Sequence, residues 1–408
     1  MNMLVKPNTS SATTKANVLI VDDELSMRAV FRDMLEELGC SVSEAENKEA
    51  LVTAIGAEIF DVIVLDLVMP GSDGIELLRT LSEQSCRATI LLSSGQDRRI
   101  LSSAQRMGRM AGLNVGGILQ KPVTIDAMES AIGDALQLKR ASQLTRPQIE
   151  SAIQSGQIVP YFQPKVDLLA ETGAPRVVGA EALVRWVDDT GELRNPGDFL
   201  AEVEAFGLMP TVTSAILSGI VDELLCLQER NGAMVPISIN VPPTMLHELD
   251  LPDQIFSHLR KAGLGPEWLV IEVTEESAMQ DPAKAIDILT RLRLKGFSVS
   301  LDDFGTGFTS IVELYRMPFS ELKLDRSIIC DLSQDEDART VARGLVALSH
   351  ELGMPVCAEG VEDQDTADFL RSIGCERAQG FHFAKPLPAD EFTRFVVSFD
   401  GTNGEAVT

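Results

Sequence analysis

The chain has 408 residues, 45% of them hydrophobic, and its formal net charge at pH 7 is -26. A chain of this length is expected to form on the order of two or three domains with sizeable cores. The acidic balance excludes nonspecific binding to a nucleic-acid backbone, which needs clustered Lys and Arg, so we expect no direct contact with nucleic acid.

The composition also limits the location and the metal chemistry. No apolar run approaches the roughly 20 residues of a membrane-spanning helix, and the N-terminal stretch lacks the basic start and apolar block of a secretory signal. We expect disordered tails at 1–16 and 399–408 and a cytoplasmic protein with no membrane contact. Six cysteines without a CxxC pair and four histidines do not make a usual zinc pattern. We therefore expect free, buried thiols, and any metal should be Mg²⁺ or Mn²⁺ held by carboxylates.

Residues 17–140 alternate short β-rich runs with amphipathic helical segments, which predicts a doubly wound parallel sheet of five strands in an α/β domain. Four of these strands end on polar residues: Asp22 and Asp23, Asp66, Ser93 and Ser94, and Lys121. In such sheets functional residues gather at the carboxyl ends of the strands. A cluster of this composition suits a divalent cation beside a nucleophilic Asp, although Asp and Ser at single strand ends also cap helices.

Through VDDE, LDLVMPGSDG and the Lys121-Pro122 pair, this segment resembles the receiver domain of bacterial response regulators. The resemblance implies that Asp66 is the phosphoacceptor for a cognate sensor histidine kinase. Asp22 and Asp23 would hold one Mg²⁺, Ser94 or Ser93 would be the switch hydroxyl, and Lys121 would contact the phosphoryl group.

Two departures from the usual receiver pattern concern how phosphorylation of Asp66 is transmitted to the rest of the protein. The loop from Ser94 to Lys121 is longer than usual, and Ile118 stands where the family commonly has an aromatic residue. Residues 141–157 have a helical pattern, with a second short helix that begins at Pro147 and stops at Gly156. We expect a helical linker, which transmits orientation better than a flexible tether and favours regulation.

Residues 158–398 continue with eight β-rich segments separated by helical ones: VPYFQPKV, VVGAEALVRW, VPISINV, WLVIEVTE, FSVSLDD, SELKLD, PVCAEGV and ERAQGF. This order predicts a closed, TIM-like (β/α)8 barrel. Because strand side chains alternate between faces, polar residues flanked by apolar ones should point to a common axis: Glu181, Asn240, Glu272, Asp302, Lys323, Glu359 and Gln379. One lysine cannot balance that many buried carboxylates, so this pattern predicts divalent cations.

Residues 148 to about 395 resemble the EAL family of cyclic di-GMP phosphodiesterases, through YFQPKV, EALVRW, SINV, IEVTEES, LDDFGTGFTS, LKLDRSI, AEGVE and AQGFHFAKP. The resemblance implies a barrel that opens cyclic di-GMP to linear pGpG with two Mg²⁺ or Mn²⁺ ions. Glu181, Asn240, Glu272 and Asp302 would bind the first ion, and Asp302 would bridge to a second held by Asp303. Adjacent acids at one strand end can serve both ions of such a pair, and Gly305 and Gly307 would let the following loop turn tightly.

The resemblance also implies roles for residues around the metals. Glu359 would lie at the attacking water, Lys323 would orient it or stabilise charge, Gln379 would help to hold the site, and Glu275 would brace the DDFGTG loop. Substrate contacts would come from Gln163, Leu183 and Arg185.

We therefore expect a two-component response regulator whose phosphodiesterase activity is controlled by phosphorylation of Asp66. The sequence does not predict whether phosphorylation raises or lowers that activity. Two alternatives stay open. A catalytically silent EAL module would bind the nucleotide and signal through contacts, and an interaction scaffold would bind no nucleotide. Barrels of this family commonly dimerise, so the resemblance implies a homodimer or higher oligomer.

Overall fold

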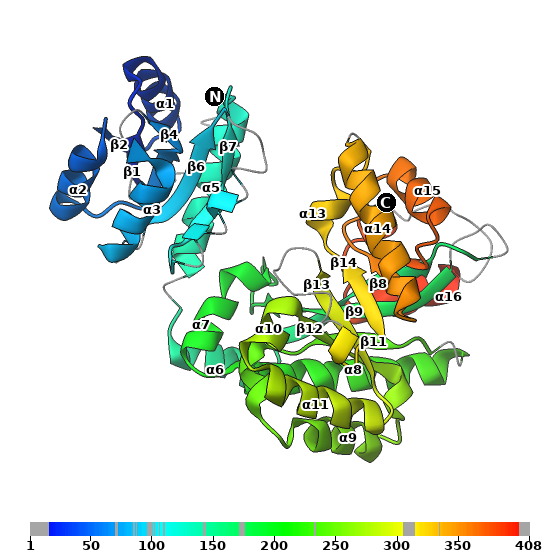
Figure 1. The fold of residues 1–408 in the computed structure, drawn as a ribbon. Helices are drawn as coiled ribbons and strands as arrows, with labels where there is room; N and C mark the ends of the chain where they lie inside the picture. The colour runs from blue at the N-terminus through cyan, green and yellow to red at the C-terminus, as the bar shows by residue number, and fades with distance from the viewer. Residues whose placement is uncertain are drawn as a thin grey trace, which may run out of the picture. The chain divides into compact units, whose positions relative to one another are not determined.

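The computed structural model describes residues 16–399 except 70–71, 85, 87, 96–100, 102, 106, 109–110, 142–143, 171–175, 232–233, 305–314 and 334. The chain divides into two compact units, one formed mainly by residues up to Leu144 and the other mainly by residues from Thr145 (Figure 1). This division lies within the expected linker, whereas nearly all of the two expected tails lies outside the described residues.

The first unit is built on a sheet of five parallel strands. The strands are β1 (Asn17–Val21), β2 (Ser41–Ala45), β3 (Val62–Asp66), β6 (Thr89–Ser94) and β7 (Val115–Gln120), in the order β2-β1-β3-β6-β7. The strand order changes direction between β1 and β3, and ligand sites of such sheets form at the carboxyl ends beside this point. A short hairpin, β4 (Val68–Met69) and β5 (Ser72–Asp73), follows β3.

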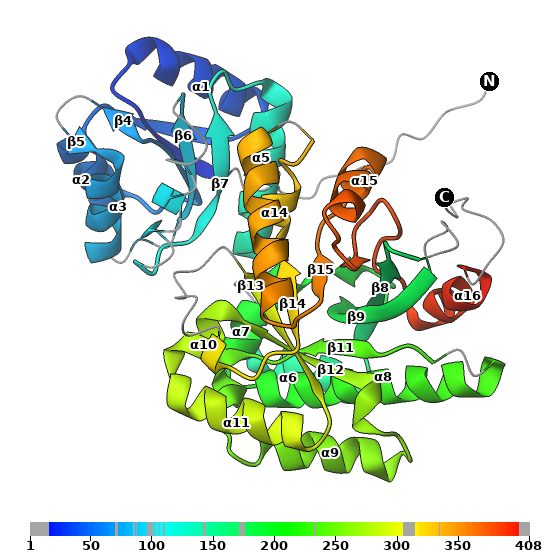
Figure 2. The ribbon, with the colours of Figure 1, turned by 45° about the vertical axis from the view of Figure 1, so that its right-hand side comes forward.

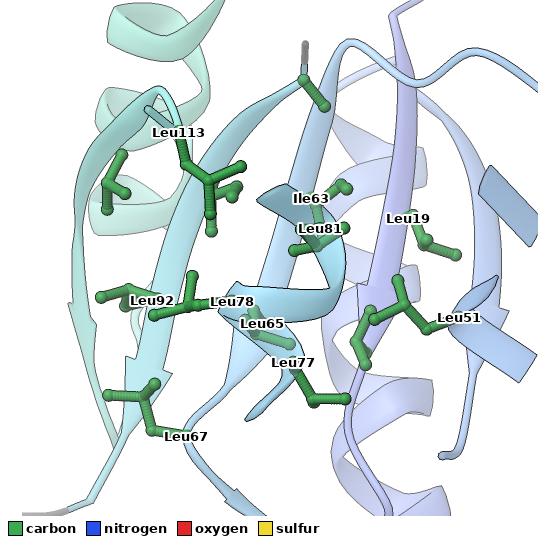
Figure 3. Packing of buried hydrophobic residues seen from close by; sticks show 14 of the residues in the cluster. Leu19, Leu51, Ile63, Leu65, Leu67, Leu77, Leu78, Leu81, Leu92 and Leu113 are labelled. Carbon is green, nitrogen blue, oxygen red and sulfur yellow. The ribbon is translucent and has the colours of Figure 1, made fainter. Parts of the chain in front are cut away.

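Helices cover both faces of this sheet. They are α1 (Leu25–Glu37), α2 (Lys48–Ala57), α3 (Gly74–Glu83) and α5 (Ile125–Ala141). On one face, strand side chains pack against α2 and α3, as Figure 3 shows for Leu19, Leu51, Ile63, Leu65, Leu77, Leu78 and Leu81. On the other face, Phe31 of α1 and Met128 of α5 belong to the same core as Val18 and Val64. The predicted doubly wound fold is therefore confirmed.

The second unit begins with α6 (Arg146–Gln154), whose start follows from its sequence. Thr145 and Gln148 form a capping box, and Pro147 occupies the first turn, where its missing N–H costs nothing. The predicted short helix is present, and its Ile149 and Ala152 are buried. Strand β8 follows after three residues.

Eight strands close into a barrel in the second unit (Figure 2). They are β8 (Ile158–Asp167), β9 (Arg176–Val187), β11 (Ile237–Asn240), β12 (Leu269–Thr274), β13 (Ser298–Phe304), β14 (Glu321–Leu324), β15 (Val356–Ala358) and β16 (Arg377–Ala378). Strands β9 to β16 pair in parallel, but β8 runs antiparallel to both β9 and β16. The barrel is confirmed, and its first strand is inverted relative to a regular (β/α)8 fold.

Helices and short elements connect these strands. The helices are α7 (Leu200–Ala205), α8 (Met209–Asn231), α9 (Leu251–Lys261), α10 (Glu275–Gln280), α11 (Pro282–Leu294), α13 (Arg326–Ile329), α14 (Glu336–Glu351), α15 (Gln364–Ser372) and α16 (Ala389–Phe399). Strand β10 (Leu193–Arg194) pairs antiparallel with the end of β9, and 3-10 turns occupy Pro196–Asp198, Pro243–His247 and Pro266–Trp268.

Helix α8 is long and apolar enough to cross a membrane by length and composition, contrary to the sequence expectation. Half of its apolar window is buried, and it packs against β8, β9, β11 and α16. That burial is typical of a core helix. The cysteines are free as expected, but Cys330 is exposed, so the prediction that all of them are buried is wrong.

Candidate active site

The first unit brings its predicted acids together at one sheet edge. Ligand oxygens of Asp22, Asp23 and Asp66 all lie within 4.8 Å of one another. Lys121, beyond the end of β7, donates from Nζ to Asp22 Oδ2 at 2.8 Å and to Asp66 Oδ2 at 2.9 Å. The backbone N–H of Val68 donates to Asp66 Oδ1 at 3.2 Å. A single ammonium thus holds two carboxylates from neighbouring strands.

Burial shapes the ionisation of this cluster. It raises the pKa of Asp66, although the hydrogen bond from Lys121 opposes this. Burial would lower the pKa of Lys121, but its bonds to Asp22 and Asp66 outweigh burial and raise that pKa. The lysine therefore stays charged beside the acids, which suits neutralisation of an incoming phosphoryl group.

Both predicted switch hydroxyls are buried at the end of β6. Ser93 pairs in register with Asp66, and Ser94 lies one residue further along. Ser93 Oγ has no hydrogen-bond partner among the described residues. Ile118 of β7 is half-buried and packs against the sheet core instead of offering an aromatic ring there. The choice between the two serines stays open.

In the second unit, acids from successive strands surround one lysine. Lys323 of β14 is fully buried. Its Nζ lies 2.5 Å from Glu359 Oε1, 2.8 Å from Glu272 Oε2, 3.1 Å from Asp302 Oδ1 and 3.3 Å from Glu181 Oε2. Glu272 and Asp302 lie in the carboxyl-terminal halves of β12 and β13, and Glu359 directly follows β15, so the cluster occupies the end where barrel enzymes carry their chemistry.

Two amides join the same cluster. Asn240, the last residue of β11, donates from Nδ2 to Glu181 Oε1 at 2.8 Å. Gln379 donates from Nε2 to Glu181 Oε2 at 2.6 Å and to Glu359 Oε1 at 3.0 Å. All seven barrel residues predicted from strand alternation therefore meet at one place.

A local irregularity explains how adjacent acids serve one site. In β13 the pairing register with β14 shifts between Leu301 and Phe304, so that Asp302 and Asp303 interrupt the ladder. The backbone dihedral φ of Asp303 is 57°, which places this residue in the left-handed conformation. That conformation is rare for residues other than glycine but is tolerated by Asp. A shift of this kind re-aims side chains next to active sites. Asp302 and Asp303 both contribute to one cluster with Glu359 instead of pointing to opposite faces.

The charges in the barrel perturb one another strongly. Burial raises the pKa of Asp302 to about 7, although Lys323 opposes this, and it raises the pKa of Glu359 well above its usual value. For Glu272, burial would raise the pKa, but Lys165 and Lys323 outweigh it and hold the pKa at about 2. For Lys323, burial would lower the pKa, but the surrounding carboxylates raise it well above its usual value. Perturbed groups of this kind gather at functional sites.

The donor set fits a pair of divalent cations. Ligand oxygens form two groups within 4.8 Å, one of Glu181, Glu272 and Asp302 and one of Asp302, Asp303 and Glu359. Asp302 belongs to both. The buried Gln379 Oε1 has no hydrogen-bond partner in the parts of the chain that the structure describes. Carboxylate and amide oxygens are the ligands that hard cations prefer, and a shared carboxylate suits two adjacent ions.

The predicted substrate residues lie on β8 and β9. Gln163 pairs in register with Glu181, and Leu183 and Arg185 follow Glu181 on the same face of β9. Gln163 donates to the carbonyl of Ala384 at 3.2 Å. Glu275 is buried at the start of α10, but the loop that it was predicted to brace, with Gly305 and Gly307, lies outside the described residues.

Sequence reasoning missed a second polar layer inside the barrel. It contains Lys165, Ser238, Ser300, Glu321 and Arg377, and most of these residues precede a predicted site residue by two positions. Lys165 is buried and donates to Glu272 Oε1 at 2.6 Å, so the prediction that one lysine serves the interior is wrong. The missed signal was the same alternation, continued one step down each strand.

Together, the fold and the two sites define a class of protein: a phosphoacceptor-type α/β unit joined to a barrel with an acidic, cation-binding interior. Models of known families match both parts, the response regulator receiver domain over residues 18–133 and the EAL domain over residues 146–386. The chain therefore belongs to the EAL domain family and carries an N-terminal receiver domain.

Relatives share parts or all of this architecture. The cyclic di-GMP phosphodiesterase RocR of Pseudomonas aeruginosa is 30% identical over 387 residues, which cover 92% of this chain and 97% of RocR. The cyclic di-GMP phosphodiesterase NbdA of the same species is 32% identical over 62% of this chain but only 32% of its own length. The solved structure of the PaMucR phosphodiesterase in complex with c-di-GMP has a TM-score of 0.56 and 33% identity, covering 60% of this chain and 98% of that one.

Proposed function

We propose that this protein is a response regulator whose EAL barrel hydrolyses cyclic di-GMP to linear pGpG under the control of phosphorylation at Asp66. The observation that carries the proposal is the buried cluster in which Lys323 contacts Glu181, Glu272, Asp302 and Glu359. The similarity to two cyclic di-GMP phosphodiesterases and to a phosphodiesterase bound to c-di-GMP supports this substrate.

The metals in this proposal are two Mg²⁺ or Mn²⁺ ions in the barrel and one Mg²⁺ in the receiver. Glu181, Asn240, Glu272, Asp302 and Asp303 would hold the barrel pair, and the ions would supply Lewis acidity for in-line attack on the phosphodiester. Asp22 and Asp23 would hold the receiver ion beside Asp66.

The barrel's own residues have distinct roles in the proposal. Glu359 has a pKa raised by burial, so it is suited to accept the proton of the attacking water. Lys323 carries positive charge to the same point and stabilises charge that develops on the phosphodiester. Gln379 holds Glu181 and Glu359 together through its two hydrogen bonds.

Around that centre, Gln163, Leu183 and Arg185 would contact the nucleotide and Glu275 would brace the loop after β13. Each monomer would consist of a receiver at 17–140, a helical linker at 141–157 and a barrel at 158–398. A sensor histidine kinase would supply the phosphoryl group, with Lys121 and Ser94 or Ser93 contacting it, and the chains would associate as homodimers or higher oligomers.

A timed assay of the full chain with cyclic di-GMP and Mg²⁺, read by chromatography of the linear product, tests this function. We expect pGpG from the wild type and none from Glu181→Gln or Glu359→Gln. Glu376→Gln is the matched control, because Glu376 accepts a hydrogen bond from the backbone N–H of Val356 at the start of the strands, away from the cluster.

The outcomes separate the alternatives. Saturable binding of cyclic di-GMP without turnover by the wild type would favour the silent receptor, and absence of any binding would favour a scaffold. Full activity in both Glu181→Gln and Glu359→Gln would contradict the site assignment.

A further inference from the structure

The barrel interior holds a second buried lysine that the proposed chemistry does not use. Lys165 lies on β8, the inverted strand. Its Nζ donates to Glu272 Oε1 at 2.6 Å and to Ser238 Oγ at 2.8 Å, and it lies 3.9 Å from Glu321 Oε1. An ammonium buried this completely needs a carboxylate partner to offset its lost hydration, and Glu272 is that partner.

The two lysines hold opposite oxygens of the same carboxylate. Lys165 binds Glu272 Oε1, and Lys323 binds Glu272 Oε2 at 2.8 Å. Lys323 is shared with three further acids on the side of the cation cluster. Lys165 approaches from below that cluster, and Glu272 is its closest acid. It can therefore keep its bond to Glu272 whatever occupies the cluster.

Neighbouring residues on β9 and β11 limit where the Lys165 side chain can lie. Gly179 of β9 pairs with it in register, and a Cβ at this glycine would lie 3.8 Å from the Lys165 side chain and 3.2 Å from the Pro236 carbonyl oxygen. The Pro236 carbonyl is the tight neighbour of this position, whereas the lysine lies at an ordinary van der Waals distance from it. Ser238, which is buried on β11, then limits where its Nζ can lie.

We infer that Lys165 is a positioning residue for the metal site, which orients Glu272 from the oxygen that faces away from the cluster. A carboxylate ligand binds a cation more tightly when its other oxygen is already held, because less ordering remains for the metal to impose. Lys165 holds the second oxygen of Glu272 in this way. The inference rests on the proposed metal site in the barrel.

The test measures Mn²⁺ binding to the full chain by electron paramagnetic resonance of the free ion, independent of turnover. Lys165→Met removes the ammonium and keeps most of the volume. We expect the dissociation constant of the barrel sites to rise about 10- to 100-fold, the range for loss of a partner that orients a ligand. The receiver cluster contains none of the altered residues, so its Mn²⁺ affinity should not change and serves as the internal reference. The receiver site is recognised as the one whose Mn²⁺ binding disappears in Asp22→Ala.

A pair of serine variants keeps the test valid if Lys165→Met does not fold. Ser238 and Ser300 are both buried and precede a proposed metal ligand by two residues. Ser238 accepts from Lys165, whereas Ser300 donates to Glu321 Oε1 at 3.0 Å. We expect Ser238→Ala to weaken Mn²⁺ binding severalfold and Ser300→Ala to leave it unchanged.

Steady-state kinetics supply a second readout. In Lys165→Met and Ser238→Ala the Mn²⁺ concentration for half-maximal turnover should rise by the same factor as the dissociation constant, with an unchanged KM for cyclic di-GMP at saturating Mn²⁺. Unchanged Mn²⁺ affinity in both variants, or equal losses in Ser238→Ala and Ser300→Ala, would overturn the role of Lys165. A wild-type barrel that binds no Mn²⁺ would instead overturn the metal site on which the inference rests.

Discussion

Replacing Lys323 by Met should make the stability of the barrel depend on metal. The Lys323 ammonium is the common partner of Glu181, Glu272, Asp302 and Glu359, and none of the lysine's surface is exposed. Removing one partner of a buried ionic group costs about 3–5 kcal/mol, because the remaining charges stay buried without compensation. For a domain of this size such a loss lowers the Tm by roughly 6–20 °C.

Divalent cations should restore most of that stability. They supply positive charge at the same carboxylates, and a ligand at 100 times its Kd adds about 2.7 kcal/mol per site. Thermal unfolding of Lys323→Met in EDTA and in saturating Mn²⁺, beside the wild type, measures both effects. Turnover of cyclic di-GMP should stay lost even in saturating Mn²⁺, since the metal replaces the charge of the lysine but not its proposed role of stabilising charge on the phosphodiester.

A surface lysine provides the control. Lys284 pairs with Asp281 at 3.1 Å, and half of its side chain is exposed. Exposed pairs contribute about 0–1 kcal/mol, so Lys284→Met should unfold within a few degrees of the wild type in EDTA and in Mn²⁺. If Lys323→Met unfolds in EDTA at the same temperature as Lys284→Met, the four carboxylates do not depend on the ammonium and the electrostatic reasoning fails.

Two further predictions follow from the perturbed acids. Because the pKa of Asp302 is raised to about 7 in the folded protein, protonated Asp302 contributes stability at low pH, and up to about 4 kcal/mol of it is lost as the pH rises through about 7. In EDTA the Tm of the wild type should therefore fall between pH 5 and pH 8 more steeply than the Tm of Asp302→Asn. Parallel Tm profiles of the two proteins would contradict this. A small-molecule phosphodonor should change turnover by the wild type but not by Asp66→Asn, which cannot accept the phosphoryl group; an equal response in both would place the donor's action elsewhere.

Much of the fold follows from periodicity. Parallel strands and covering helices repeat with spacings that predict both units, and seven polar residues on or next to the barrel strands meet as alternation requires. The inversion of β8 could not be predicted in this way, because an alternating pattern reads the same in both chain directions. The antiparallel pairing of β8 with β9 brings Gln163 beside Glu181 and Lys165 beside Gly179.

The geometry of the adjacent acids was also hidden from the sequence. Regular alternation would send Asp302 and Asp303 to opposite faces, and only the register shift and the left-handed backbone at Asp303 bring both to one cluster. The register shift and the backbone conformation of Asp303 depend on how β13 pairs with β14, and no local sequence pattern encodes that pairing. The glycines that follow at 305 and 307 lie outside the described residues, so their predicted role in the turn stays a prediction.

The two polar layers of the barrel differ in charge balance, and this difference explains where cations are needed. In the lower layer, Arg377 bonds to Glu321, and Lys165 donates to Glu272 of the layer above. Glu321 thus has a cation of its own. At the carboxyl ends of the strands, a single ammonium faces a larger group of carboxylates: Glu181, Glu272, Asp302, Asp303 and Glu359. The uncompensated negative charge is thus confined to the layer that would meet the substrate, and the divalent cations that balance it should bind there and not deeper in the barrel.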